Sequence, residues 1–204
     1  MLVRNRMSKD PVTVTPEELL IQARVRMQKG GFRRLPVVRN GQLVGIITDL
    51  DMREHAGYLD RTEVKVAMSE RPVTVTPATT LETTAQILLA RKIGGLPVVE
   101  NGRLVGMITT SDVLEAFLDV MGASEETSKR IDFIMGKEQG GVAEASRIVV
   151  QEGGEVLGVG TYRGRWGDNP VCYLRLRSGD ANAIAKLLKE KGFEVLGVHE
   201  TSKA

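Results

Sequence analysis

The chain has 204 residues, of which 42% are hydrophobic and 26% are charged, and its formal net charge is +2. This composition is typical of globular proteins, and the balanced charge gives no sign of nucleic-acid or membrane-surface binding. No apolar run approaches the roughly 18–20 residues that cross a bilayer. One cysteine, Cys172, and two histidines leave little material for a disulfide, a zinc site or a histidine-based triad. We therefore expect no metal, no cofactor and a cytoplasmic location.

The first 120 residues contain an internal repeat. Residues 11–16 read PVTVTP and so do residues 72–77, which gives an offset of 61. At the same offset NGQLVGIIT recurs as NGRLVGMIT. The sequence therefore predicts two copies of one unit, at 1–61 and 62–121.

The residue pattern of each copy predicts the element order β-α-β-β-α. Val12–Val14 is a short β-prone run, and Thr15–Glu18 fits a capping box with proline at the first helical position. In the second copy Thr79–Glu82 fits a capping box equally well, which leaves that helix start open by a turn. Two apolar runs flanking Asn-Gly then predict a β-hairpin in each copy. A second helix is expected at residues 50–56 and 110–121.

The pattern changes after a small, polar stretch at 122–129, which we expect to be a linker. Beyond it the periodicity predicts strand, helix, strand, strand, helix and strand, in that order. These elements are expected at residues 131–135, 142–150, 156–162, 171–177, 181–191 and 193–198. The order βαββαβ is that of the ferredoxin-like split βαβ unit, which we place at 130–204.

Three segments and their copies carry a resemblance to a known family: VTVTP, GFRRLP (31–36) and GIITDLD (45–51). On these segments, residues 1–121 resemble the CBS-domain pair, named after cystathionine β-synthase. The last 70 residues resemble an ACT domain, notably in Gly-Gly-Val-Ala-Glu. A CBS pair followed by an ACT-like domain is similar to the acetoin utilization protein family. The implied fold is α/β (α+β): two β-α-β-β-α CBS units in a pseudo-twofold pair, plus a ferredoxin-like C-terminal domain.

The resemblance to CBS pairs implies a regulatory protein rather than an enzyme. Such pairs commonly bind AMP, ADP, ATP or S-adenosylmethionine in two clefts, and each cleft joins Thr-x-x-Asp of one unit to the segment before the proline of the other. We expect ligand binding to be transmitted to the ACT-like domain or to an unidentified regulated protein. The alternative is a dimeric interaction scaffold with vestigial ligand sites.

The chemistry of Thr-x-x-Asp suits a nucleotide. An aspartate between a strand and a helix can accept hydrogen bonds from both ribose hydroxyls, and the threonine hydroxyl and free helix amides can receive phosphate. The same residue types also serve as ordinary helix caps, which is the alternative interpretation. The candidates are Asp51 and Asp112 for ribose, with Thr48, Thr109 and Ser111 nearby.

Glycines and prolines in the repeat would let the backbone approach an adenine edge, and two threonines would line the same slot by family analogy. The alternative is that these residues only shape turns and edge strands. They are Gly31, Gly94, Gly95, Pro36 and Pro97, with Thr13 and Thr74.

Three arginines distinguish the first copy from the second. Arg33, Arg34 and Arg53 have the counterparts Gly94, Gly95 and Leu114. Guanidinium groups could bind phosphate as bidentate forks, although most arginines are simply solvated. We expect Arg34 and Pro36 to border the cleft of Asp112, and Asp49 to repel phosphate near Asp51. On this basis Asp112→Ala should weaken nucleotide binding more than Asp51→Ala.

Two further expectations concern the ACT-like domain and assembly. The ACT resemblance implies an amino-acid site at the turn Gln139, Gly140, Gly141 and Val142, whose alternative is a purely structural helix start. The helix containing Val113, Leu114, Phe117, Leu118 and Met121 is apolar over more than one narrow stripe. We therefore expect a homodimer, with no nucleic-acid or membrane partner.

Overall fold

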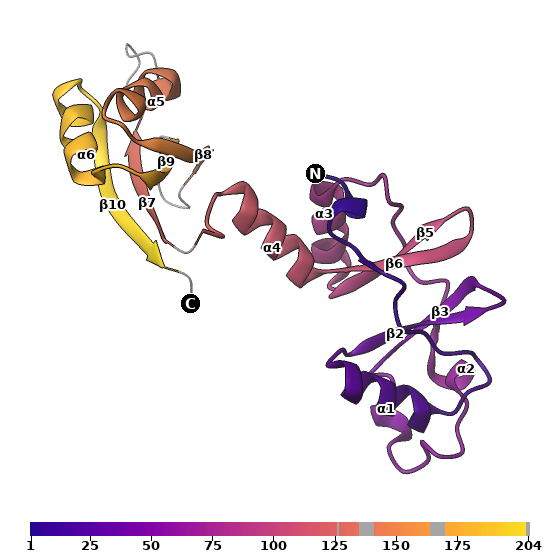
Figure 1. Ribbon diagram of the computed structural model, residues 1–204. Coiled ribbons are helices and arrows are strands. Elements are labelled where there is room, and N and C mark those ends of the chain that lie inside the picture. Colours follow the sequence, from indigo (N-terminus) through magenta and orange to yellow (C-terminus); the bar gives the residue numbers. More distant parts are fainter. Residues whose placement is uncertain (126, 135–140, 164–169, 203–204) are drawn as a thin grey trace. The chain divides into compact units, whose positions relative to one another are not determined.

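The computed structural model describes residues 1–125, 127–134, 141–163 and 170–202. The chain divides into two compact units, Met1–Leu114 and Glu115–Ala204 (Figure 1). The division falls within one helix, earlier in the chain than the boundary expected at residue 121. Each unit is described by itself below.

The first unit holds both copies of the repeat. Its helices are α1 (Leu20–Gly30), α2 (Val64–Ala67) and α3 (Leu81–Arg91), and α4 (Thr110–Val120) begins in it. Its strands are β1 (Ser8–Lys9), β2 (Arg34–Arg39), β3 (Gln42–Thr48), β4 (Ser69–Glu70), β5 (Gly95–Glu100) and β6 (Arg103–Thr109). Short 3-10 turns lie at Val3–Asn5 and Arg53–His55.

The sheet of the first unit exchanges strands between the two copies. Its order is β1-β6-β3-β2, all antiparallel; β4 pairs with β3 and β5 with β6. Thus β1, which belongs to the first copy, pairs with a strand of the second copy, and β4, which belongs to the second copy, pairs with a strand of the first. Glycines permit this approach, because a Cβ added at Gly45 would lie 3.0 Å from the Ser69 carbonyl oxygen, and one at Gly106 2.8 Å from that of Ser8.

The predicted hairpins are confirmed in both copies. Asn40 and Gly41 have φ of 52° and 79°, and Asn101 and Gly102 have 50° and 78°. Two successive residues in the left-handed region are what a tight turn between twisted strands requires, and Asn-Gly adopts this conformation readily.

The helices differ from prediction at two places. α1 begins at Leu20, so the expectation that Pro16 occupies its first position is wrong. The first amides of α1 have tertiary partners instead: Leu20 N–H donates to the Thr62 carbonyl and Ile21 N–H to that of Leu59, each at 2.8 Å. The helix expected at 50–56 is only the 3-10 turn Arg53–His55, which has no buried residue.

The second unit contains the rest of α4 and a four-stranded antiparallel sheet. Its elements are β7 (Thr127–Ile134), α5 (Gly141–Gln151), β8 (Glu155–Tyr162), β9 (Val171–Ser178), α6 (Ala181–Glu190) and β10 (Glu194–Ser202). The sheet order β10-β7-β9-β8 together with βαββαβ is the predicted ferredoxin-like arrangement. β7 begins inside the stretch expected to be a linker.

The core of the second unit lies on one face of this sheet, against α5 and α6. Ile131 and Phe133 of β7 are fully buried there with Leu174 of β9, Val149 of α5 and Ile184 of α6. None of the helices in the described parts of either unit is long and apolar enough to cross a membrane.

Candidate functional site

A cavity of about 770 Å³ lies in the first unit where the two copies meet. It is lined by side chains from both copies, including the end of β3, the segment after β4 and the end of α3. Its lining residues are Arg33, Arg34, Ile46, Thr48, Asp49, Leu50, Asp51, Ser69, Glu70, Arg71, Pro72, Val73, Arg91, Lys92, Ile93, Gly94, Gly95, Pro97 and Thr110.

Strand exchange explains why this cavity mixes the copies. β4 pairs with β3 through Gly45–Glu70 and Ile46–Ser69. The cavity is lined by Thr48, the last residue of β3, where Thr-x-x-Asp begins, by β4 and by residues 71–73, which follow β4. The chain turns sharply there, since Arg71 has a φ of 51° just before Pro72.

Asp51 uses one carboxylate oxygen to hold its own turn. Its Oδ2 accepts hydrogen bonds from the Thr48 backbone N–H at 2.8 Å and the Thr48 hydroxyl at 2.7 Å. Asp112 makes the same bonds with Thr109, at 2.6 and 2.7 Å. Among the described residues, Oδ1 of Asp51 has no hydrogen-bond donor. One oxygen thus performs the capping role, and the other remains available to a ligand.

Arg34 enters this cavity through a space left by two glycines. A Cβ added at Gly94 would lie 2.5 Å from Nη2 of Arg34, and one at Gly95 would overlap Nη1. The structure therefore places the Arg34 guanidinium in the cavity of Asp51, whereas the sequence predicts that it borders the cleft of Asp112. The reason is steric: any side chain at Gly94 or Gly95 would fill the space that the guanidinium occupies.

The Arg34 guanidinium is half-buried and forms no hydrogen bond or ion pair with any residue that the structure describes. Burial lowers the pKa of Arg34, the charge of Arg33 lowers it further, and Asp49 opposes both effects. A cation held under these conditions is stabilised by an incoming anion. This observation points to a negatively charged ligand in the cavity.

The cavity is cationic as a whole. Five basic side chains line it, Arg33, Arg34, Arg71, Arg91 and Lys92, against three acidic ones, Asp49, Asp51 and Glu70. Sequence reasoning missed Arg71, Arg91 and Lys92. Arg71 could have been noticed in the repeat: it directly precedes the second PVTVTP, and its counterpart before the first PVTVTP is the acidic Asp10.

The other candidate residues lie in several places. Thr109, Ser111 and Asp112 lie where β6 passes into α4, and Pro36 is buried in β2. Thr74 is exposed, while Gly31 and Arg53 line a different cavity. Of the expected amino-acid site, Gly141 and Val142 begin α5, and Gln139 and Gly140 lie outside the described residues. Within the described ranges, no group of three or more His, Cys, Asp or Glu residues could hold a metal ion.

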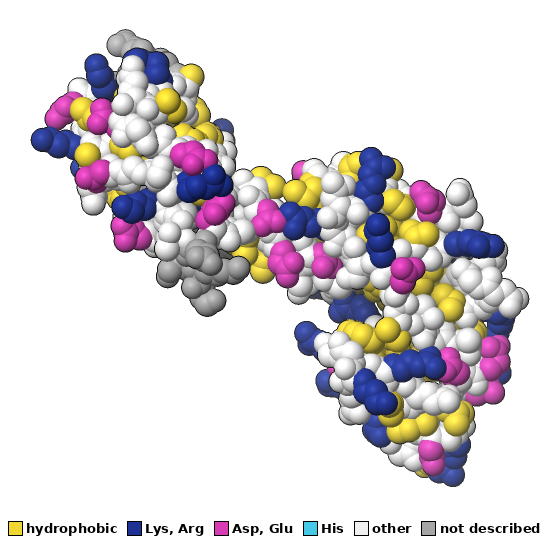
Figure 2. All heavy atoms as spheres, in the orientation of Figure 1, with side chains coloured by type: hydrophobic (Ala, Val, Ile, Leu, Met, Phe, Trp, Pro, Cys, Tyr) yellow, Lys and Arg dark blue, Asp and Glu magenta, His cyan; other side chains and the backbone are white. Residues whose placement is uncertain are grey.

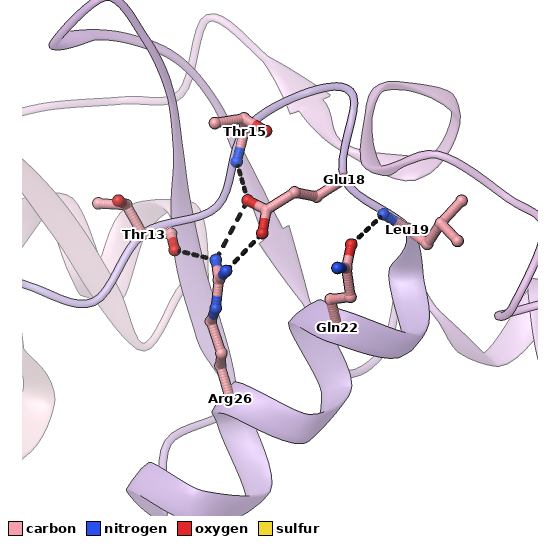
Figure 3. Close-up of polar contacts among 6 residues, drawn as sticks. All are labelled: Thr13, Thr15, Glu18, Leu19, Gln22 and Arg26. Atoms are coloured by element: carbon pink, nitrogen blue, oxygen red, sulfur yellow. Dashed lines mark hydrogen bonds and ion pairs between the residues drawn. The ribbon is translucent and has the colours of Figure 1, made fainter.

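The backbone carbonyl of Thr13 is hydrogen-bonded to a side chain of α1 (Figure 3). Nη1 of Arg26 donates to the Thr13 carbonyl oxygen at 2.6 Å, and the same guanidinium forms an ion pair with Glu18. Glu18 also accepts the Thr15 backbone N–H at 2.6 Å. In the second copy Ile87 and Thr79 replace Arg26 and Glu18.

This ion pair gives a stability prediction. We expect Arg26→Ile to lower the free energy of unfolding by about 1–2 kcal/mol, because it leaves the partly buried Glu18 without its guanidinium. Glu18→Thr/Arg26→Ile installs the arrangement of the second copy and should lose less than the sum of the single variants. Urea unfolding measures this, and purely additive losses would show that the pair is not coupled.

The same pair sets a pH dependence. Burial raises the pKa of Glu18, but hydrogen bonds from Arg26 and Thr15 outweigh it, and the pKa lies below its ordinary value of 4.5. A lowered carboxyl pKa contributes stability above the ordinary value and loses it as pH falls through the lowered one. The stability difference between wild type and Arg26→Ile should therefore shrink when pH falls below 4.5.

Comparisons with known proteins agree with this architecture. Residues 3–57 and 62–119 match the family model of the CBS domain. A CBS domain-containing protein of Dictyostelium discoideum is 35% identical over 136 residues, which cover 59% of this chain and 94% of that protein. Inosine-5'-monophosphate dehydrogenase of Korarchaeum cryptofilum is 39% identical over 108 residues, or 52% of this chain and 22% of the enzyme. Only a small part of that enzyme is therefore matched.

Solved structures resemble a little over half of the chain. The CBS domain pair of protein MJ0100, in complex with 5'-methylthioadenosine and S-adenosyl-L-methionine, has 28% identity and a TM-score of 0.53, covering 57% of this chain and 95% of its own. CBSX2 in complex with AMP has 29% identity and a TM-score of 0.52, covering 57% and 96%. A Vibrio cholerae protein described as an acetoin utilization protein (AcuB) has 30% identity and a TM-score of 0.54, covering 58% and 90%. With two matched domains spanning more than half of its length, the chain belongs to the CBS domain family.

Proposed function

We propose that this protein is a non-catalytic regulator that senses an adenine nucleotide in the cavity of Asp51. The observation that carries the proposal is the half-buried Arg34 guanidinium, which lines the same cavity as Asp51 and forms no hydrogen bond or ion pair with the described residues. Complexes of related CBS pairs with AMP, and with S-adenosylmethionine and 5'-methylthioadenosine, support an adenosine-containing ligand.

The lining of the cavity matches the parts of a nucleotide. Its volume of about 770 Å³ is within the range of small-molecule sites. Oδ1 of Asp51 is available to a ribose hydroxyl, and Arg34 and Arg71 offer guanidinium groups for phosphate. Ile46 and Ile93 add apolar surface for a base.

Transmission of binding belongs to the same proposal. Thr110 lines the cavity and is the first residue of α4, whose last residues belong to the second unit. A shift of this first turn on ligand binding would be carried along one continuous helix. An ACT-type response of the second unit, an amino-acid ligand near Gly141, a regulated protein partner and a cytoplasmic location remain predictions.

A panel of thermal unfolding measurements tests the proposed function. A ligand present at 100 times its dissociation constant stabilises the folded state by about 2.7 kcal/mol, which is readily observed as a rise in Tm. We expect AMP, ADP or ATP to raise the Tm of the full chain. If neither these nucleotides nor S-adenosylmethionine raised it, the scaffold with vestigial sites would replace the sensor.

Assembly into a homodimer is suggested by α4. Leu114, Phe117, Leu118 and Val120 are all more than 40% exposed in the single chain. Covering such apolar side chains with a second copy would remove them from water. We expect sedimentation at micromolar concentration to give about twice 22.3 kDa, and Phe117→Glu to shift the protein toward the monomer. Val66→Glu, an exposed site on α2, is the matched control; a wild-type monomer would contradict this expectation.

A further inference from the structure

A second cavity, of about 410 Å³, lies wholly within the first copy of the repeat. It is formed by the C-terminal half of α1, the loop that leads into β2 and the turn after β3. Its lining residues are Arg24, Met27, Gln28, Gly31, Phe32, Arg33, Asp49, Met52 and Arg53. The fold and the nucleotide proposal leave this cavity without a role.

The cavity combines an apolar floor with a cationic rim. Met27 and Met52 are 5% and 4% exposed and form the floor with Phe32. Arg24 and Arg53 are exposed, and neither guanidinium has a hydrogen bond or ion pair with the residues in the described ranges. Figure 2 shows arginine and lysine side chains beside hydrophobic ones over the region of α1.

The second copy shows which of these residues the fold itself requires. At the offset of 61, the apolar floor residues of the first copy have apolar counterparts in the second copy. The polar and charged rim residues also have apolar counterparts there. The floor residues Met27, Phe32 and Met52 correspond to Leu88, Ile93 and Val113, and the rim residues Arg24, Gln28 and Arg53 correspond to Ala85, Leu89 and Leu114. The fold therefore demands an apolar floor in both copies and does not demand cations above it.

We propose that this cavity binds a small anion with an apolar body, such as an aromatic phosphate or carboxylate. Methionine side chains adapt to flat or irregular apolar groups, and guanidinium groups bind carboxylate or phosphate through paired hydrogen bonds. A cavity of about 410 Å³ is large enough for one such molecule. Asp49 also faces the cavity, but three arginines outnumber it.

The proposal is independent of nucleotide sensing. Arg33 and Asp49 line both cavities, and the Asp49 backbone N–H donates to the Arg33 carbonyl at 3.0 Å, so this backbone pair lies between them. Arg24 and Arg53 line only the second cavity, and Arg34 lines only the first. Variants of these three residues therefore address the two cavities separately.

Calorimetric titration with phenyl phosphate tests the site in the full chain. Arg24→Ala and Arg53→Leu install the residues of the second copy, which the same fold already accommodates. We expect each to weaken binding at least about fivefold, because each removes a charged hydrogen-bond donor from the rim. Arg103→Gln is the matched control: it removes one positive charge at an exposed position outside both cavities, and Gln42 is its counterpart. It should change binding less than about twofold.

Several results would overturn the proposal. One is the absence of heat with the wild type at about 5 mM phenyl phosphate. Another is an equal loss in Arg103→Gln, which would indicate only general electrostatic attraction. Loss in Arg34→Gln with unchanged binding in the Arg24 and Arg53 variants would place the probe in the nucleotide cavity. Inorganic phosphate should bind at least about tenfold more weakly, because it lacks the apolar body, and equal binding would contradict the site. Failure of AMP to bind would leave all these outcomes unaffected.

Discussion

Asp51→Asn is expected to weaken AMP binding by at least about tenfold while the fold is retained. The asparagine oxygen can still accept the Thr48 N–H and hydroxyl, so the turn after β3 keeps its cap. What is lost is the charged acceptor for a ribose hydroxyl, and losing such a hydrogen bond costs about 1.5–3 kcal/mol. That cost corresponds to a roughly ten- to hundredfold rise in Kd. Calorimetric titration of AMP measures it.

Asp112→Asn is the matched control for this change. It alters the same motif in the other copy, with the same hydrogen bonds to Thr109. We now expect the smaller loss here, opposite to the expectation from sequence, because Arg34 and Arg71 line the cavity of Asp51 and the counterpart of Arg71 in the other copy is the acidic Asp10. Equal losses of AMP affinity in Asp51→Asn and Asp112→Asn would mean that the two clefts are equivalent. A larger loss in Asp112→Asn would restore the original expectation.

Arg34→Gln is expected to weaken AMP binding roughly ten- to hundredfold and to spare S-adenosylmethionine. The guanidinium is half-buried and has no counter-charge within hydrogen-bonding distance in the described structure, so an incoming phosphate gains a charge-assisted pair. S-adenosylmethionine carries a positively charged sulfonium, which the five basic side chains of the cavity disfavour. Removing Arg34 therefore reduces the preference of the cavity for AMP, which carries a phosphate, over S-adenosylmethionine, which carries a sulfonium.

Two further variants sharpen this result. Arg34→Lys keeps the charge but loses the bidentate fork, so it should restore part of the AMP affinity. Arg103→Gln removes one charge at an exposed position outside the cavity and should leave AMP binding nearly unchanged. If AMP and S-adenosylmethionine lost affinity equally in Arg34→Gln, the arginine would be shaping the cavity without selecting phosphate.

Local signals were sufficient for much of the fold. Asn40-Gly41 and Asn101-Gly102 specify their turns by backbone conformation alone, and the hairpins followed. In the second unit the change between helical and strand periodicity predicted all six elements in order. The start of α1 could not be predicted in this way, because its first amides bond to the carbonyl oxygens of Leu59 and Thr62, which are distant in sequence.

The candidate site was predictable only in part for the same reason. Asp51 and Thr48 lie within one motif, and their hydrogen bonds are local. The positions of Arg34 and Arg71 depend on contacts between the copies: Arg71 follows β4, which pairs with a strand of the other copy, and Arg34 uses space at Gly94. Sequence periodicity reports which face of an element a residue occupies, and it does not report which distant backbone leaves room for its side chain.

The most direct test of nucleotide sensing is a crystal structure of the full chain grown with AMP. We expect AMP in the cavity of Asp51, with a ribose hydroxyl within hydrogen-bonding distance of Oδ1 of Asp51 and the phosphate contacting the guanidinium of Arg34. AMP bound at Asp112 with the Asp51 cavity empty, or bound with its phosphate directed away from Arg34, would contradict it.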